Sequence, residues 1–244
     1  MEAVDYNQTI ALQYAAYRPL LHQKILANCL TNSEYAIGLD VGCGTGQSAI
    51  ALTDFCEQVI GVEPSQAMLK KAIPHQQVEY QHYDGQQFDF LDNQFEIITF
   101  AGVLYYAKSQ QLLHEVIRVA KNKATVVVYD FKVLLKAILK KLLLNISPSS
   151  TSPYNHQVNF DGLEQQNLIK NISDQQSIQL DIQIADLAHL FLSSKENYQL
   201  FAHYFNHLQP YDLVLEQLQL IFDDKTAAAP VETYFTVYTV AKAS

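Results

Sequence analysis

Three glycines at alternate positions, Gly42, Gly44 and Gly46, lie between a short apolar segment and a segment with helical spacing. Glycine is needed where a chain turns with positive φ, or where the backbone approaches a ligand without a Cβ in the way. Residues 36–41 predict a buried strand and residues 47–55 predict a helix. Because open α/β sheets bind ligands at the carboxyl ends of their strands, we expect a ligand at this loop.

An acidic residue, Glu63, ends the next predicted strand, residues 58–63. It lies seventeen residues after Gly46. A carboxylate at a strand end can accept two hydrogen bonds from the vicinal hydroxyls of a ribose. The glycine loop and this acid together predict a cofactor that contains adenosine, whereas either feature alone would be weak evidence.

The spacing of the glycines separates two such cofactors. In the dinucleotide fingerprint Gly-x-Gly-x-x-Gly the third glycine comes one position later than it does here, and Gln47 occupies its place. Asp40, just before the loop, would repel a pyrophosphate and attract an ammonium group. The pattern therefore favours a cofactor that carries an amino acid over NAD.

The stretch Leu39-Asp40-Val41-Gly42-Cys43-Gly44-Thr45-Gly46 resembles motif I of class I S-adenosylmethionine-dependent methyltransferases. Val62-Glu63-Pro64-Ser65 resembles their ribose-binding segment, and Tyr83-Asp84-Gly85 resembles the segment that brackets the adenine. Tyr14-Ala15-Ala16-Tyr17-Arg18-Pro19 is similar to an N-terminal segment of the branch that contains trans-aconitate methyltransferase-like enzymes. The resemblance spans about residues 10–131.

This resemblance implies S-adenosylmethionine as the cofactor and S-adenosylhomocysteine as its product. Arg18 would pair with the cofactor carboxylate, and Tyr14 would cover the sulfonium, whose positive charge suits an aromatic face. The residues that we assign to the cofactor are Tyr14, Arg18, Asp40, Gly42, Cys43, Gly44, Gln47, Glu63, Pro64, Met68, Asp84, Gly85 and Ala101.

The loop after the fourth predicted strand departs from the family pattern. Relatives commonly carry an acid there opposite the methionine part of the cofactor, and the branch often has His-Trp where Tyr105-Tyr106 stands. No residue can be named as a general base from the sequence, so the catalytic residue is left open. The candidates for the acceptor pocket are Tyr105, Tyr106, Tyr154 and His156.

Strands and helices alternate through the first half of the chain, which predicts parallel βαβ units. We expect an α/β fold with a Rossmann-like, mostly parallel sheet of about seven strands, an antiparallel last strand and a helical cap. One domain is predicted, residues 1–244, with a helical cover (1–35), a cofactor-binding core (36–131), a cap and sheet edge (132–230) and the final strand (231–244). Within the cap the pattern predicts helices at 132–144, 186–205 and 211–222 and a strand at 177–184.

Bulk composition argues against several classes of partner. The formal net charge of −9 disfavours binding to phosphate backbones, so no nucleic-acid partner is expected. No apolar stretch reaches membrane-spanning length and no secretory leader is recognisable, so we expect no membrane partner and a cytoplasmic location. The three cysteines lack ligand spacing, and the pair His203 and His207 lacks a third ligand, so no metal site is predicted. The oligomeric state is left open.

The predicted reaction is an SN2 transfer of the sulfonium methyl to an oxygen, nitrogen or carbon of a small-molecule acceptor, carboxylates included. Alignment and exclusion of water would be the main tasks of the protein. Two alternatives stand beside it: an NAD-dependent oxidoreductase, and a non-catalytic protein that binds S-adenosylmethionine.

Overall fold

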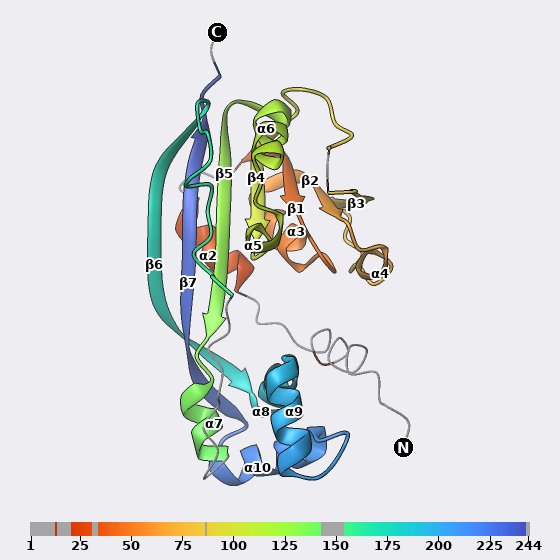
Figure 1. The fold of residues 1–244 in the computed structure, drawn as a ribbon, viewed down its shortest axis with the longest axis vertical. Coiled ribbons are helices and arrows are strands. Elements are labelled where there is room, and N and C mark those ends of the chain that lie inside the picture. The colour runs from red at the N-terminus through yellow and green to blue at the C-terminus, as the bar shows by residue number, and fades with distance from the viewer. Residues whose placement is uncertain (1–12, 14–20, 31–33, 86, 143–153, 243–244) are drawn as a thin grey trace. The chain divides into compact units, whose positions relative to one another are not determined.

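The computed structural model describes residues 13, 21–30, 34–85, 87–142 and 154–242 (Figure 1). Contacts divide the chain into two compact units. The larger unit comprises Leu20–Lys132, Ser152–Gln176 and Thr233–Ser244, and the smaller unit comprises Met1–Pro19, Val133–Thr151 and Ser177–Glu232. The single domain expected for residues 1–244 stays a prediction.

Seven strands form one sheet in the order β3-β2-β1-β4-β5-β7-β6. Strand β1 pairs in parallel with β2 and β4, β2 with β3, and β4 with β5, while β7 runs antiparallel to its neighbours (Figure 1). The strands are β1 (Tyr35–Val41), β2 (Cys56–Glu63), β3 (Val78–His82), β4 (Phe95–Ala101), β5 (Ala120–Val133), β6 (Leu168–Gln183) and β7 (Thr226–Val240). The predicted fold class is confirmed. The strand order reverses between β1 and β4, and open α/β sheets bind ligands at such a point.

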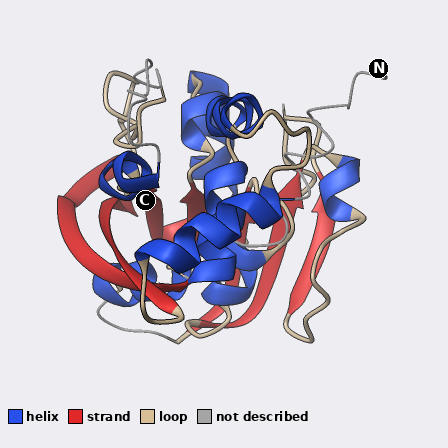
Figure 2. Cartoon of the chain, turned by 90° about the horizontal axis from the view of Figure 1, so that it is seen from below, coloured by secondary structure: helices blue, strands red, loops and turns tan. Residues whose placement is uncertain are grey.

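Helices accompany the strands in both units, and Figure 2 separates the two kinds of element by colour. The helices of the larger unit are α2 (His22–Cys29), α3 (Gln47–Leu52), α4 (Gln66–Leu69), α5 (Leu104–Ala107) and α6 (Gln110–Val119). Those of the smaller unit are α7 (Lys136–Leu142), α8 (Ile184–Leu192), α9 (Lys195–Tyr204) and α10 (Tyr211–Ile221). Among the described residues, no helix is long and apolar enough to cross a membrane.

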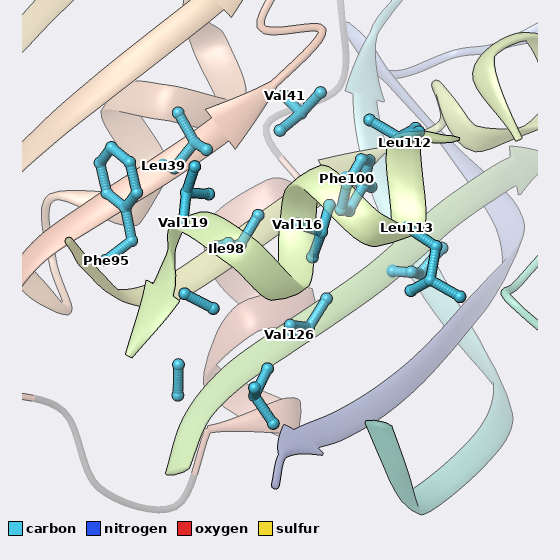
Figure 3. Packing of buried hydrophobic residues seen from close by; sticks show 14 of the residues in the cluster. Leu39, Val41, Phe95, Ile98, Phe100, Leu112, Leu113, Val116, Val119 and Val126 are labelled. Carbon is cyan, nitrogen blue, oxygen red and sulfur yellow. The ribbon is translucent and has the colours of Figure 1, made fainter. Parts of the chain in front are cut away.

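Helix α6 shows how the sequence covers one face of the sheet. Ser109 caps its start by accepting a hydrogen bond from the Leu112 amide at 3.1 Å. Apolar residues then recur at helical spacing and point toward the sheet, where they are buried against side chains of β1, β4 and β5 (Figure 3). These helix residues are Leu112, Leu113, Val116 and Val119. The packed layer gives the loops at the strand ends a rigid base.

The smaller unit has its own apolar core, built from α7 to α10 together with strand residues. Helix α7 buries Ile138, Leu139 and Leu142 in that core. Its lysines, Lys136, Lys140 and Lys141, are exposed. The helix expected from residue 132 therefore begins at Lys136, since Lys132 and Val133 belong to β5, and its basic side is solvated.

Two sequence expectations need correction, and one helix was missed. The helix expected over 186–205 is two helices, because the chain breaks at Ser193 and the Ser194 hydroxyl caps α9 by accepting from the Asn197 amide at 3.2 Å. Strand β6 begins at Leu168, nine residues before the expected start, since pairing at the sheet edge requires no burial of side chains. Helix α5 was not predicted, because four residues are too few for periodicity to register.

Candidate active site

The glycine loop, residues 39–46, ends β1 and is anchored by main-chain hydrogen bonds. The amides of Gly42 and Cys43 both donate to the Val62 carbonyl oxygen on β2, at 2.8 and 3.1 Å. Gly42 has a φ of 73°, and a Cβ added there would lie 2.4 Å from Val103 Cγ2. Glycine is thus required at this position both by the backbone angle and by close packing. The loop is joined to β2 on one side and to the loop after β4 on the other.

Gly44 differs from Gly42 because it faces open space. Its φ is 57°, and the nearest atom to an added Cβ is Met68 Sδ at 3.7 Å. Its amide donates to Glu63 Oε2 at 3.1 Å, and Glu63 Oε1 accepts from the Ser65 amide at 2.9 Å. Each carboxylate oxygen can accept a second hydrogen bond. An open glycine beside a fixed carboxylate fits the ribose of an adenosine cofactor.

Asp40 is fully buried at the end of β1. Its Oδ2 accepts from Ser48 Oγ on α3 at 2.5 Å, and its Oδ1 accepts from Thr99 Oγ1 on β4 at 2.7 Å. Burial is the main reason that the pKa of Asp40 is raised to about 6. The carboxyl group therefore ties the base of the glycine loop to two other elements. Its expected attraction for the cofactor ammonium stays a prediction.

Asp84 and Gly85 follow β3 and are both exposed. Asp84 lines a cavity of about 250 Å³ together with Val62, Tyr83 and Phe88. A cavity bounded by an acid and by apolar and aromatic side chains suits a flat nitrogen base with an exocyclic amine. The residues expected to bracket the adenine thus lie at the carboxyl edge of the sheet, as the ribose candidate Glu63 does.

The remaining cofactor candidates occupy varied positions. Gln47 begins α3 and is half-buried, as is Ala101 at the end of β4. Pro64 and Met68 are exposed, whereas Cys43 is buried. Tyr14 and Arg18 lie outside the described residues. The assignments of all these residues to the cofactor stay predictions.

The four acceptor-pocket candidates, which we call the acceptor cluster, are joined by ring contacts through Tyr154. Tyr105 and Tyr106 lie on α5, and their ring centroids are 4.5 and 5.7 Å from that of Tyr154. The Tyr154 ring is 4.7 Å from that of His156. The Tyr154 hydroxyl donates to the Gly102 carbonyl oxygen at 2.5 Å, which joins the cluster to the loop after β4.

Sequence reasoning missed two residues that complete this cluster. Asp130, on β5, accepts a hydrogen bond at Oδ2 from His156 Nδ1 at 2.9 Å. Tyr234, on β7, stacks on the His156 ring with centroids 5.9 Å apart and planes 16° apart. The sequence around Asp130 does carry a signal, because this acid follows three consecutive valines, Val126 to Val128, as Glu63 follows an apolar segment. Tyr234 carried none, since it lies about eighty residues from the histidine on which it stacks.

One family model matches the part of the chain that carries the glycine loop. Residues 39–128 match the family model described as a methyltransferase domain. The matched segment is less than half of the chain and contains the glycine loop, Glu63, Asp84 and Ala101. The match agrees with the enzyme class and the cofactor expected from the sequence.

One curated relative matches about half of the chain. A protein of Dictyostelium discoideum assigned as a methyltransferase is 30% identical over 122 residues. The aligned part covers 46% of this chain and 46% of that relative, so the chain matches about half of the relative's length.

Solved structures share the fold over most of the chain. A protein assigned as a type II methyltransferase from Anaeromyxobacter dehalogenans has a TM-score of 0.65 at 16% identity, with 92% of this chain and 98% of that chain covered. A protein assigned as a methyltransferase from Bacillus halodurans has a TM-score of 0.53 at 17% identity, with 90% and 99% covered. A chain from the Haloferax volcanii complex between the Trm112 methyltransferase activator and its assigned methyltransferase has a TM-score of 0.56 at 17% identity, with 99% and 100% covered. At these identities the likeness concerns the fold alone.

Proposed function

We propose that the chain is an S-adenosylmethionine-dependent methyltransferase that acts on a small-molecule acceptor. The observation that carries the proposal is the fixed carboxylate of Glu63 beside the open Gly44, within the segment that matches a methyltransferase domain. An alternating glycine loop without this acid would fit several nucleotide ligands. The pair is what selects a ribose next to the loop.

In this proposal each part of the carboxyl edge has a separate task. Glu63 accepts hydrogen bonds from the ribose hydroxyls, the main chain at Gly44 lies along the cofactor, and Asp84 faces the adenine. When bound, S-adenosylmethionine supplies an already activated methyl group on its sulfonium. The protein therefore contributes mainly alignment of the acceptor and exclusion of water.

The two alternatives are less well supported. An NAD-dependent oxidoreductase would need a third glycine at the position of Gln47, and the family match supports a different cofactor. A protein that binds S-adenosylmethionine without transferring the methyl group would share every feature of the glycine loop. A measurement of methyl transfer distinguishes such a binding protein from an enzyme.

Finer assignments stay predictions. Membership of the trans-aconitate methyltransferase-like branch depends on residues 14–19, which lie outside the described residues. The acceptor atom, a cytoplasmic location and the absence of nucleic-acid and membrane partners are likewise expectations from the sequence.

Calorimetric titration with S-adenosylmethionine, S-adenosylhomocysteine and NAD tests the cofactor. We expect binding of the first two and none of NAD. Glu63→Ala removes hydrogen bonds to a charged group, each contributing roughly 1.5–3 kcal/mol, so the Kd should rise about tenfold or more. Glu57→Ala is the matched control, because Glu57 is an exposed glutamate near the other end of β2.

Two outcomes contradict the proposal. Tighter binding of NAD than of S-adenosylmethionine would support the oxidoreductase. An unchanged Kd in Glu63→Ala, with a circular dichroism spectrum like that of the unchanged protein, would remove Glu63 from the ribose site. Glu63→Gln keeps the side-chain volume and covers the case in which the alanine variant does not fold.

A further inference from the structure

The contact between His156 and Asp130 has the geometry of an oriented imidazole. His156 Nδ1 lies 2.9 Å from Asp130 Oδ2, and the two side chains are 23% and 16% exposed. Asp130 Oδ1 accepts from the Phe131 amide at 2.7 Å, so both carboxylate oxygens are engaged. An ionised carboxylate only accepts hydrogen bonds, which places the proton of a neutral His156 on Nδ1. Nε2 is then the nitrogen with a free lone pair to accept a proton.

Aromatic rings hold the imidazole from two directions. Tyr234 stacks on its face, and Tyr154 meets it at an interplanar angle of 67°. Tyr154 is itself fixed through its hydrogen bond to Gly102. A ring held by stacking, by an edge contact and by a carboxylate keeps one orientation, as a proton acceptor in catalysis must.

The position of this dyad, Asp130 with His156, links it to the glycine loop. In the register of β4 and β5, Ala101 pairs with Tyr129, so Asp130 lies level with the loop that follows β4. A Cβ added to Gly102 would lie 3.1 Å from Asp130 Oδ1, and the next residue, Val103, packs against Gly42. A continuous line of contacts therefore runs from the glycine loop to the dyad along the carboxyl edge.

A cavity of about 330 Å³ opens beside the imidazole. This volume is at the lower end of the range for small-ligand pockets. Its lining is mostly polar, with hydroxyl and amide groups that can hydrogen-bond an uncharged acceptor. Residues that line it include His156, Asn159, Ser173, Asp174, Tyr234 and Thr236.

We propose that His156 is the general base of methyl transfer to a hydroxyl acceptor and that Asp130 is its positioning residue. The inference rests on the proposed function. As the acceptor oxygen forms its bond to the methyl carbon, the carbon–sulfur bond breaks and its electron pair stays on sulfur. The hydroxyl proton passes to His156 Nε2, and Asp130 stabilises the resulting imidazolium until the proton leaves to solvent. A carboxylate acceptor would need no such base, so the dyad favours a hydroxyl.

The first test needs no cofactor. Nitrogen-15 NMR of the histidine rings at pH 8 reports which ring nitrogen carries the proton. We expect the Nδ1–H form for His156 in the unchanged protein and a shift toward the Nε2–H form in Asp130→Asn. If the tautomer of His156 is unchanged in Asp130→Asn, the contact is purely structural and the role of Asp130 is overturned.

The second test is transfer of labelled methyl from S-adenosylmethionine to a panel of small phenols, alcohols and carboxylates. His156→Gln should lower kcat for hydroxyl acceptors by on the order of 10²-fold or more, while the Kd for the cofactor stays unchanged. His22→Gln is the matched control, because His22 is also half-buried, with its Nδ1 3.1 Å from the Tyr129 hydroxyl oxygen. It should keep its activity and report any general cost of losing a packed imidazole.

The pH profile distinguishes a base from a cation that binds an anionic acceptor. A base must be neutral, so kcat/KM should rise with pH across the range in which imidazoles titrate and then level off. A cationic His156 that binds a carboxylate would give the opposite slope. The titratable groups around the imidazole are Asp130 on β5, Tyr154 on its own loop, Asp174 on β6 and Tyr234 on β7.

The outcomes separate this inference from the proposed function. If S-adenosylmethionine does not bind, the proposed function fails. If it binds and the panel yields only methylated carboxylates, or no methylated hydroxyl compound, the base assignment fails and the cofactor site stands. Full activity in a folded His156→Gln variant would also overturn it.

Discussion

The glycine loop and the acceptor cluster lie at the same edge of the sheet but are held together by different forces. The glycine loop is fixed mainly by main-chain amides, with side-chain hydrogen bonds to Glu63 and Asp40 in addition. The acceptor cluster is fixed mainly by side chains, through ring contacts and the hydrogen bond from His156 to Asp130, with Tyr154 also bonded to the Gly102 carbonyl oxygen. Main-chain geometry tolerates change in most side chains, whereas a side-chain cluster changes with every substitution. The difference suits a constant cofactor and a variable acceptor.

Gly42→Ala should have the largest effect, because it disturbs the main chain of the glycine loop. The new Cβ would need a positive φ and would overlap Val103, at a cost on the order of 3 kcal/mol or more. We expect S-adenosylmethionine to bind about 100-fold more weakly, measured by calorimetry. Gly162→Ala is the control, because Gly162 has a φ of 84° but nothing within 4 Å of an added Cβ. An equal loss of S-adenosylmethionine affinity in both variants would contradict the prediction, because the contact with Val103 would then not be needed to explain the loss.

A substitution of Asp40 tests whether its buried charge lowers the stability of the fold at the base of the glycine loop. Its pKa is raised from 3.8 to about 6 by burial, so the folded state binds its proton more tightly than the unfolded chain does. The contribution of protonated Asp40 to the free energy of unfolding is therefore present below about pH 4 and is lost as pH rises through 6. A difference of this size between the folded and unfolded pKa corresponds to a loss on the order of 3 kcal/mol.

Asp40→Asn should remove this pH dependence, because an amide does not ionise and the Ser48 and Thr99 hydroxyls can accept as well as donate. Urea unfolding at pH 4.5 and pH 7 measures the difference between the variant and the unchanged protein. Parallel stability curves for the two proteins would contradict the prediction.

A substitution of Arg118 tests whether side-chain hydrogen bonds also stabilise the segment beside the proposed adenine cavity. Its guanidinium donates to the carbonyl oxygens of Phe88 and Phe90 and to the carboxylates of Glu115 and Asp92, at 2.8 to 3.0 Å. Arg118→Ala should destabilise the fold by about 2 kcal/mol, which lowers Tm by roughly 4–8 °C in a chain of this size. Arg118→Lys should recover little, since lysine lacks the planar fork. A Tm within about 1 °C of the unchanged protein for Arg118→Ala would show that the network is dispensable.

Labelling of Cys43 should give the smallest effect of the four tests. Burial raises the pKa of its thiol well above the usual range, so little thiolate is available for reaction. We expect negligible labelling of Cys43 by iodoacetamide at pH 8 in the folded protein and full labelling in urea, measured by mass spectrometry. Fast labelling of the folded protein would mean that the glycine loop opens.

Much of the parallel half of the fold could be predicted because its signals are local. Strands β1 and β2 were predicted within two residues at each end. Each contains a short apolar run before its turn residues, and such a run predicts its own burial. The antiparallel edge was less readable. The polar stretch at the start of β6 is almost entirely exposed and pairs through its backbone, which leaves no pattern in the side chains.

The sequence by itself determined the glycine loop, the acid that closes it and the alternation that places both at one edge of the sheet. Turn chemistry and periodicity act over a few residues, so they can be read without a structure. Only the tertiary structure decided that Asp130, His156 and Tyr234 meet, because their contact depends on strand order and on the return of β7. Contacts between residues far apart in the chain follow from packing of the whole sheet, which no local pattern records.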